Sequence, residues 1–135
     1  MKASSLSFRA AVLLVIVGMT WGLVMAISQD HSAMPAHAHL NLLGWVSLFL
    51  FGIFYKLHPA LNYSAKALAQ VVIWIAATLV LTCGVALVHT GHDIGEPIAA
   101  IGSIVALGDM LFFGWLVHDA TRSVASTPVS TVPAE

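Results

Sequence analysis

Histidine is the residue type whose number and spacing in this chain point to chemistry. The sequence holds seven His against five Lys and Arg, and imidazole nitrogens bind zinc, copper and haem iron. His37 and His39 stand two positions apart, which is about 200° around a helix of 3.6 residues per turn. Their side chains therefore point to opposite faces of a helix. Such a pair suits two sites, or one site shared with a neighbouring chain, better than a single metal clamp.

A second histidine pair follows later in the chain. His89 and His92 are three positions apart, which places two side chains on the same face of a helix. With Asp93 beside them, they are candidate ligands for copper or zinc. Gly91 lies between them and indicates that the helix ends here. The pair is thus either a metal site or two interfacial side chains. The remaining histidines are expected at the interface with their polar tips in water: His31, His58 and His118.

Asp109 is the acidic residue that stands alone within an apolar stretch. A carboxyl group inside a membrane is costly, and it usually faces a polar interior or serves a function. We expect it either to hydrogen-bond to Ser103 or Thr82 or to transfer protons.

The composition requires membrane-spanning elements to carry these side chains. The chain is 59% hydrophobic and 8% charged, whereas a soluble domain has about 25% charged residues. Four apolar stretches are long enough for helices across about 30 Å of hydrocarbon, at residues 8–27, 37–57, 67–89 and 97–118. We therefore expect an all-α membrane protein, with a four-helix transmembrane bundle or arc in one domain of residues 1–122. Residues 123–135, rich in Ser, Thr and Pro, are expected to form a disordered tail.

The basic residues predict the orientation of the helices. All five fall on one side of the predicted topology: Lys2, Arg9, Lys56, Lys66 and Arg122. The positive-inside rule makes that side cytoplasmic, together with both termini. Five histidines then lie at the opposite, outer side: His31, His37, His39, His89 and His92. We expect an integral protein of a bacterial inner membrane, surrounded by lipid, whose first apolar stretch is a retained helix.

Two further classes are excluded on composition. Five Lys and Arg residues are too few to line a nucleic-acid groove. The single cysteine, Cys83, provides no disulfide framework.

Residues 37 to 59 carry a resemblance to a known family. The run HAHLNLLGWVSLFLFGIFYKLHP resembles a helix of the haem–copper oxidase catalytic subunit, and most of all that of the cbb-type oxidases and nitric oxide reductases. In that family a His-x-His pair begins the tenth of twelve helices, and its two members bind different haems on opposite faces. The resemblance implies that His37 and His39 bind haem b, with Asn41 and Trp45 beside it. Asn41 is expected to hydrogen-bond a ligand imidazole or a neighbouring helix, and Trp45 to pack against porphyrin or other helices.

The chain departs from this family in its helix number. The family's copper histidines come from two helices that have no counterpart here, so the resemblance does not imply oxygen reduction. The family's twelve helices resemble three arcs of four, and this chain resembles one arc. Three copies would rebuild the ring as a homotrimer. Each space between subunits would then hold one haem b, bound by His37 of one protomer and His39 of its neighbour.

Three functions therefore stand side by side. The first is a b-type haem protein that transfers electrons, with a partner that the sequence does not identify. The second is a membrane protein that binds copper or zinc through the outer histidines. The third is an assembly subunit without a cofactor. The sequence identifies no catalysed reaction.

Overall fold

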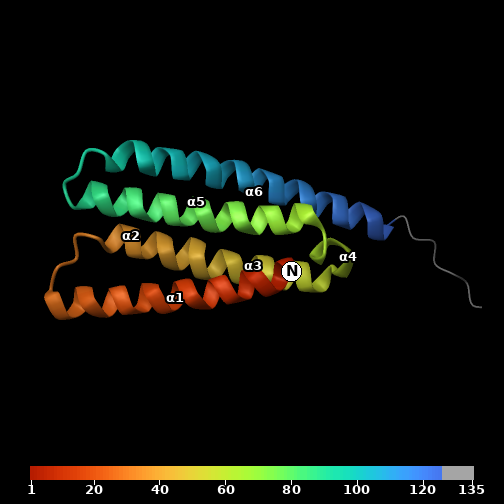
Figure 1. The fold of residues 1–135 in the computed structure, drawn as a ribbon, viewed down its shortest axis with the longest axis horizontal. Coiled ribbons are helices and arrows are strands. Elements are labelled where there is room, and N and C mark those ends of the chain that lie inside the picture. Colours follow the sequence, from red (N-terminus) through yellow and green to blue (C-terminus); the bar gives the residue numbers. More distant parts are fainter. Residues whose placement is uncertain (126–135) are drawn as a thin grey trace, which may run out of the picture.

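Four long apolar helices form the part of the chain that the computed structural model describes, residues 1–125 (Figure 1). In chain order the elements are α1 (Ala3–Ser28), α2 (Met34–His39), the π-helix η1 (Leu40–Ser47), α3 (Leu48–Leu57), α4 (Pro59–Asn62), α5 (Ala65–His89) and α6 (Gly95–Ala125). The elements α2, η1 and α3 run on as one helix, which we call the second span. All four long helices have the length and hydropathy to cross a membrane. For residues 1–125 the prediction of an all-helical fold with four helices long and apolar enough to cross a membrane is confirmed.

Residues with restricted or unusual backbones end the helices. After α1, Gln29 adopts a left-handed conformation with φ 56°. The second span stops at His58 because the residue before Pro59 disfavours helical geometry. Ser64 caps α5 by accepting a hydrogen bond from the backbone N–H of Ala67 at 3.1 Å. The observed helices extend beyond the predicted ranges by several residues at some ends. The predictions followed the apolar stretches, and the polar residues at helix ends lie outside those stretches.

The C-terminal boundary differs from the predicted one. Helix α6 extends to Ala125, three residues beyond the predicted domain. The rest of the predicted disordered tail, residues 126–135, lies outside the described residues.

The helices alternate in direction, which separates two kinds of end (Figure 1). The turns at 29–33 and 90–94 lie at the same end of the helices. We call it the histidine end, because the five outer histidines belong to these turns or to the helix ends beside them. The N-terminus, α4 and the last turns of α6 lie at the opposite end. All five Lys and Arg residues belong to helix ends on that side, which we call the basic end.

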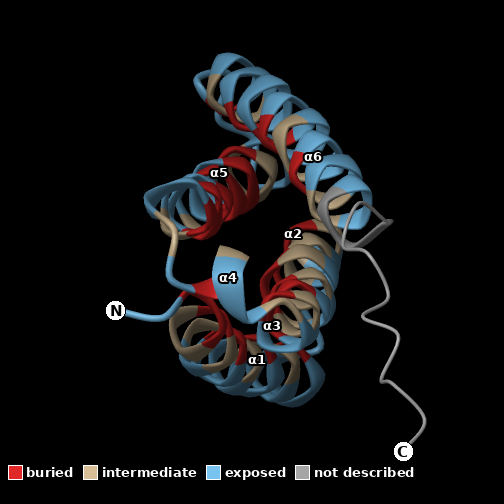
Figure 2. Cartoon of the chain, turned by 90° about the vertical axis from the view of Figure 1, so that its right-hand side faces the viewer, coloured by how far each residue is buried: buried red, intermediate tan, exposed pale blue. Residues whose placement is uncertain are grey.

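Small residues bring the helices together as two close pairs. Helix α1 packs on the second span, where Gly44 faces Leu14 and Gly52 faces Phe8. Helix α5 packs on α6, and a side chain at Gly84 would run into the backbone of Ala99. Close approach through glycine is the usual basis of helix association in a bilayer. Buried residues line the faces that the helices turn to one another, and exposed residues point outward, as Figure 2 shows.

Candidate functional site

His39 closes the short helix α2, and a backbone hydrogen bond orients its ring. Pro35 occupies the first turn of α2, where its missing N–H costs nothing. The His39 Nδ1 atom lies 2.7 Å from the carbonyl oxygen of Pro35, so Nδ1–H donates to that oxygen. The proton is then absent from Nε2, whose lone pair can bind a metal. The His39 side chain is half-buried.

His37 lies in the contact between α1 and the second span. A Cβ atom at Gly22 of α1 would come within 2.9 Å of the His37 ring, so glycine leaves the space that the imidazole occupies. The Asn41 amide nitrogen lies 3.1 Å from His37 Nε2 and donates to the His37 carbonyl oxygen at 3.0 Å. The expected contact between Asn41 and an imidazole is therefore present.

The two rings stay on different sides of the helix. His37 and His39 both belong to the regular α-helix α2, so the separation of about 200° applies to them. His37 faces α1, and His39 lies about 200° from it around α2. The outer half of α6 packs on α5 through Gly84 and Gly102. Toward the basic end, Phe113 of α6 packs on Phe51 and Phe54 of the second span. One chain thus does not bring both imidazoles to one point.

A π-helical segment follows the histidine pair directly. In η1 the backbone hydrogen bonds join residues that are five positions apart. Such π-helical segments are rare in proteins overall, and many of those that occur lie at functional sites. The Trp74 indole N–H of α5 donates to the Leu43 carbonyl at 3.0 Å, which ties this irregular segment to the neighbouring span. Trp45, within η1, packs on Phe49 at a ring-centroid distance of 4.8 Å, and Phe49 packs on Phe8 of α1 at 5.0 Å. The Trp45 side chain therefore belongs to an aromatic row between α1 and the second span.

His89 and His92 are not on one continuous helix. Helix α5 ends at His89, and Gly91 takes a left-handed φ of 82°. The His92 N–H donates to Leu87 O at 2.9 Å and the Gly91 N–H to Val88 O at 3.1 Å, the pattern of a Schellman cap. Both histidines are exposed. Within residues 1–125 no group of three or more His, Cys, Asp or Glu side chains is placed to hold a metal ion.

A buried polar chain in the basic-end half of the helices is the feature that the sequence predicted only in part. The Tyr55 hydroxyl donates to Gln70 Oε1 at 2.7 Å, and Gln70 Nε2 donates to Asp109 Oδ2 at 2.7 Å. These three side chains link α3, α5 and α6, and we call them the polar chain. The predicted partners of Asp109 were wrong. The Ser103 hydroxyl donates to Ala99 O of its own helix at 2.8 Å, and the Thr82 hydroxyl has no hydrogen-bond partner in the described structure.

Two members of the polar chain, Gln70 and Tyr55, were not predicted, although their polarity is visible in the sequence. Gln70 and Tyr55 are polar side chains inside predicted spans, as Asp109 is, but nothing in the sequence says that they share a height in the membrane. The antiparallel arrangement of the helices sets that height. It brings Gln70 to Asp109 across a separation of 39 residues.

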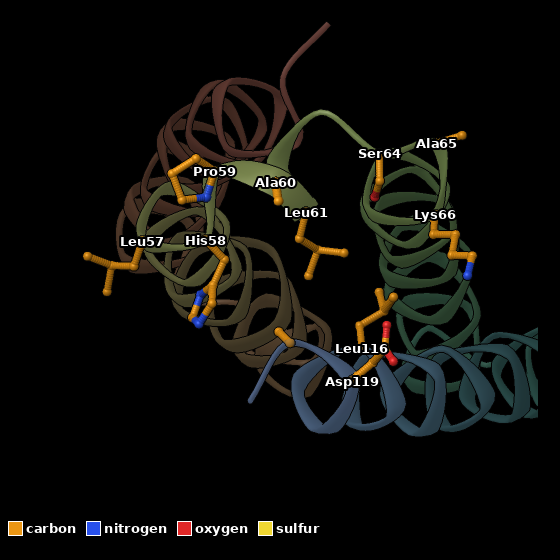
Figure 3. Close-up of a pocket in the computed structure, with 11 residues that line it drawn as sticks. Leu57, His58, Pro59, Ala60, Leu61, Ser64, Ala65, Lys66, Leu116 and Asp119 are labelled. Carbon is orange, nitrogen blue, oxygen red and sulfur yellow. The ribbon is translucent and has the colours of Figure 1, made fainter. Parts of the chain in front are cut away.

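A cavity of about 590 Å³ opens at the basic end (Figure 3). Apolar side chains of α3, α4 and α6 form most of its wall, and the polar side chains on its rim are His58, Ser64, Lys66 and Asp119. The His58 Nδ1–H donates to Phe54 O at 2.8 Å, and the Lys66 ammonium lies 4.7 Å from the centre of the Trp115 ring.

No family model, no curated protein and no solved structure matches this chain.

Proposed function

We propose that this chain is a membrane b-type haem protein that transfers electrons, with haem held between the protomers of a homotrimer. The observation that carries the proposal is the placement of two half-buried imidazoles on different sides of one helix. One of them, His39, already has Nδ1–H bound to a carbonyl and Nε2 available. This is the orientation in which proteins hold a metal-binding histidine.

The divergence of the two rings favours a site shared by two chains. His37 and His39 of one chain cannot reach the same iron from opposite sides of α2. A neighbour related by a threefold axis would supply the missing ligand in each space. His39 of one protomer and His37 of the next would complete one site, with His37 turned out from its place over Gly22 and released by Asn41. Two axial imidazoles leave iron coordinatively full, which favours electron transfer over ligand chemistry.

The residues around the pair have the size and polarity that haem requires. Ala38 lies between the histidines, is exposed and leaves room for a large flat ring, whereas Ala36 is buried within the chain. No Lys or Arg stands at the histidine end, so neutral polar groups must meet the haem propionates there. The exposed side chains of His89, Thr90 and His92 lie at the same end and have hydrogen-bond donors for that purpose.

The orientation in the membrane is part of the same proposal. The basic end lies in the cytoplasm of a bacterial cell, with both termini, and the histidine end lies at the outer side of the inner membrane. Haem near the outer surface would exchange electrons with a partner on that side.

Substitution of the ligands tests the proposal. In the trimer every site uses one His37 and one His39, so His39→Ala and His37→Ala should each remove the low-spin haem spectrum from all three sites. His31→Ala is the matched control, because it removes an exposed histidine at the same end that the proposal gives no contact with haem, and it should keep full haem occupancy. The visible spectrum of each purified variant measures this. Full low-spin haem in both the His37→Ala and the His39→Ala proteins would contradict shared ligation.

A further inference from the structure

The polar chain lies in the basic-end half of the helices, because Gln70 is five residues from the start of α5 and Tyr55 is two residues from the end of α3. Asp109 is near the centre of α6, and Gln70 and Tyr55 meet it from α5 and α3. Tyr55 and Gln70 have no exposed surface and Asp109 is 4% exposed. The position therefore offers no water shell to a charge.

The hydrogen bonds of Asp109 do not suffice for a carboxylate. Gln70 donates to Oδ2, whereas Oδ1 is buried without a hydrogen-bond partner in the described structure. The groups that face Asp109 are the neutral amide of Gln70 on α5 and, behind it, the Tyr55 hydroxyl of α3. No cation is among them. An isolated carboxylate in such a site costs far more than one hydrogen bond returns, so the neutral acid is favoured.

Residues that line the cavity at the basic end lie within two helical turns of Asp109 and of Tyr55, although no member of the polar chain lines the cavity itself. Leu116 lies in the cavity wall and is itself fully buried. It follows Asp109 by seven residues, which is two turns on the same face of α6 and a rise of about 10 Å. On α3, His58 of the cavity rim follows Tyr55 by three residues. Among the cavity residues of α6, Leu116 is thus the one nearest in sequence to Asp109.

We propose that Asp109 is a proton-binding site inside the membrane, which holds its proton at neutral pH and exchanges it with water through the cavity at the basic end. Its proton sits on a carboxyl oxygen, and Gln70 holds the other oxygen in place. The titratable groups at the mouth of this route are His58, Lys66 and Asp119, which border the cavity. This site is independent of the haem proposal, because it involves other residues at another depth.

Infrared spectroscopy of the protein in lipid vesicles tests the proposal. The other aspartates, Asp30, Asp93 and Asp119, are all exposed, so Asp109 is the one aspartate of the sequence that is buried. We expect one carbonyl band of a protonated carboxyl, which shifts when the aspartates carry ¹³C in the carboxyl group and shifts again in D₂O. The band should be lost in Asp109→Asn and kept in Asp119→Asn. Absence of such a band from the labelled wild-type protein would overturn the proposal even if the Asp109→Asn protein fails to fold.

The route is tested by the rate of exchange into D₂O. Leu116→Phe enlarges the cavity residue of α6 that is nearest in sequence to Asp109, and it should slow the deuterium shift of the band. Leu111→Phe is the matched control, since Leu111 lies on the same helix with 69% of its surface exposed to lipid. It should leave the rate unchanged. A band that never exchanges, or equal rates in the Leu116→Phe and wild-type proteins, would contradict access through the cavity.

Discussion

Three helical histidines share one local hydrogen bond. His39, His58 and His89 each donate Nδ1–H to the carbonyl four residues earlier, at 2.7, 2.8 and 2.9 Å. This bond orients an imidazole but does not by itself identify a ligand. His58 stacks on Phe54 at 4.2 Å, and His89 is exposed. What distinguishes His39 is a second half-buried imidazole, His37, on the other side of the same helix.

Substitution of Tyr55 tests how much the polar chain contributes to the stability of the packed helices. Tyr55→Phe removes the donor to Gln70 Oε1 and leaves this buried oxygen without a partner. We expect a loss of about 1 kcal/mol in the free energy of unfolding, as for other single hydrogen bonds inside membranes. Unfolding in mixed lipid–detergent micelles measures it. Tyr63→Phe is the control, since Tyr63 is 66% exposed and its replacement should have little effect. Equal stability of the Tyr55→Phe and wild-type proteins would show that the polar chain has no stabilising role.

At the level of the helices, two glycines allow α5 and α6 to pack closely. The backbone of α6 lies so close to that of α5 at Gly84 and Gly102 that no larger residue fits. By contrast, Gly108 and Gly114 of α6 face open space. The first two glycines thus serve packing between α5 and α6, and the last two do not serve it within one chain.

This difference predicts opposite effects of the same substitution. Gly84→Ala should destabilise the protein by about 1–3 kcal/mol, because the new methyl group meets the backbone of Ala99 and the helices must separate. Gly108→Ala adds a methyl group where nothing lies within 4 Å, and it should be neutral or stabilise the helix by up to about 1 kcal/mol. Unfolding in mixed micelles compares them. An equal effect of both substitutions would contradict the packing of α5 on α6.

The helices were predictable from the sequence to different degrees. Long apolar stretches separated by Pro, Gly and polar residues sufficed for the four spans, because length and hydropathy alone determine them. The π-helix was not predictable. Its irregular hydrogen bonding accompanies the contact between Trp74 and Leu43, which depends on how two spans lie together.

The candidate site shows the same division. The helical spacing of His37 and His39 was enough to predict different faces, and Asp109 was recognised as a polar residue within a span. The partners Gln70 and Tyr55 were missed because helix packing, and not local sequence, brings them to Asp109. Gly91 was predicted to end the helix, and in the structure it lies just after the end of α5, so that His92 is outside this helix.

At the scale of the whole molecule, the four helices form two close pairs that leave apolar faces exposed. Large side chains are exposed along all four spans, among them Leu13, Leu42, Val72 and Leu107. Lipid covers such faces, and a trimer would cover part of them with neighbouring chains.

The assembly has a definite stoichiometry under the proposed function. Native mass spectrometry of the protein released from mild detergent should give three chains and three haems. A monomer or dimer that retains one haem per chain would contradict ligation across a threefold set of interfaces, because the second imidazole would then have to come from elsewhere.

The visible absorption spectrum of the wild-type protein, purified from haem-replete cells, tests the central claim most directly. It should be recorded before and after addition of dithionite. We expect a Soret band that shifts on reduction, together with the sharp bands in the visible region that six-coordinate, low-spin haem b gives when two imidazoles bind the iron. A spectrum without a Soret band would contradict the proposal that this four-helix protein carries haem at His37 and His39.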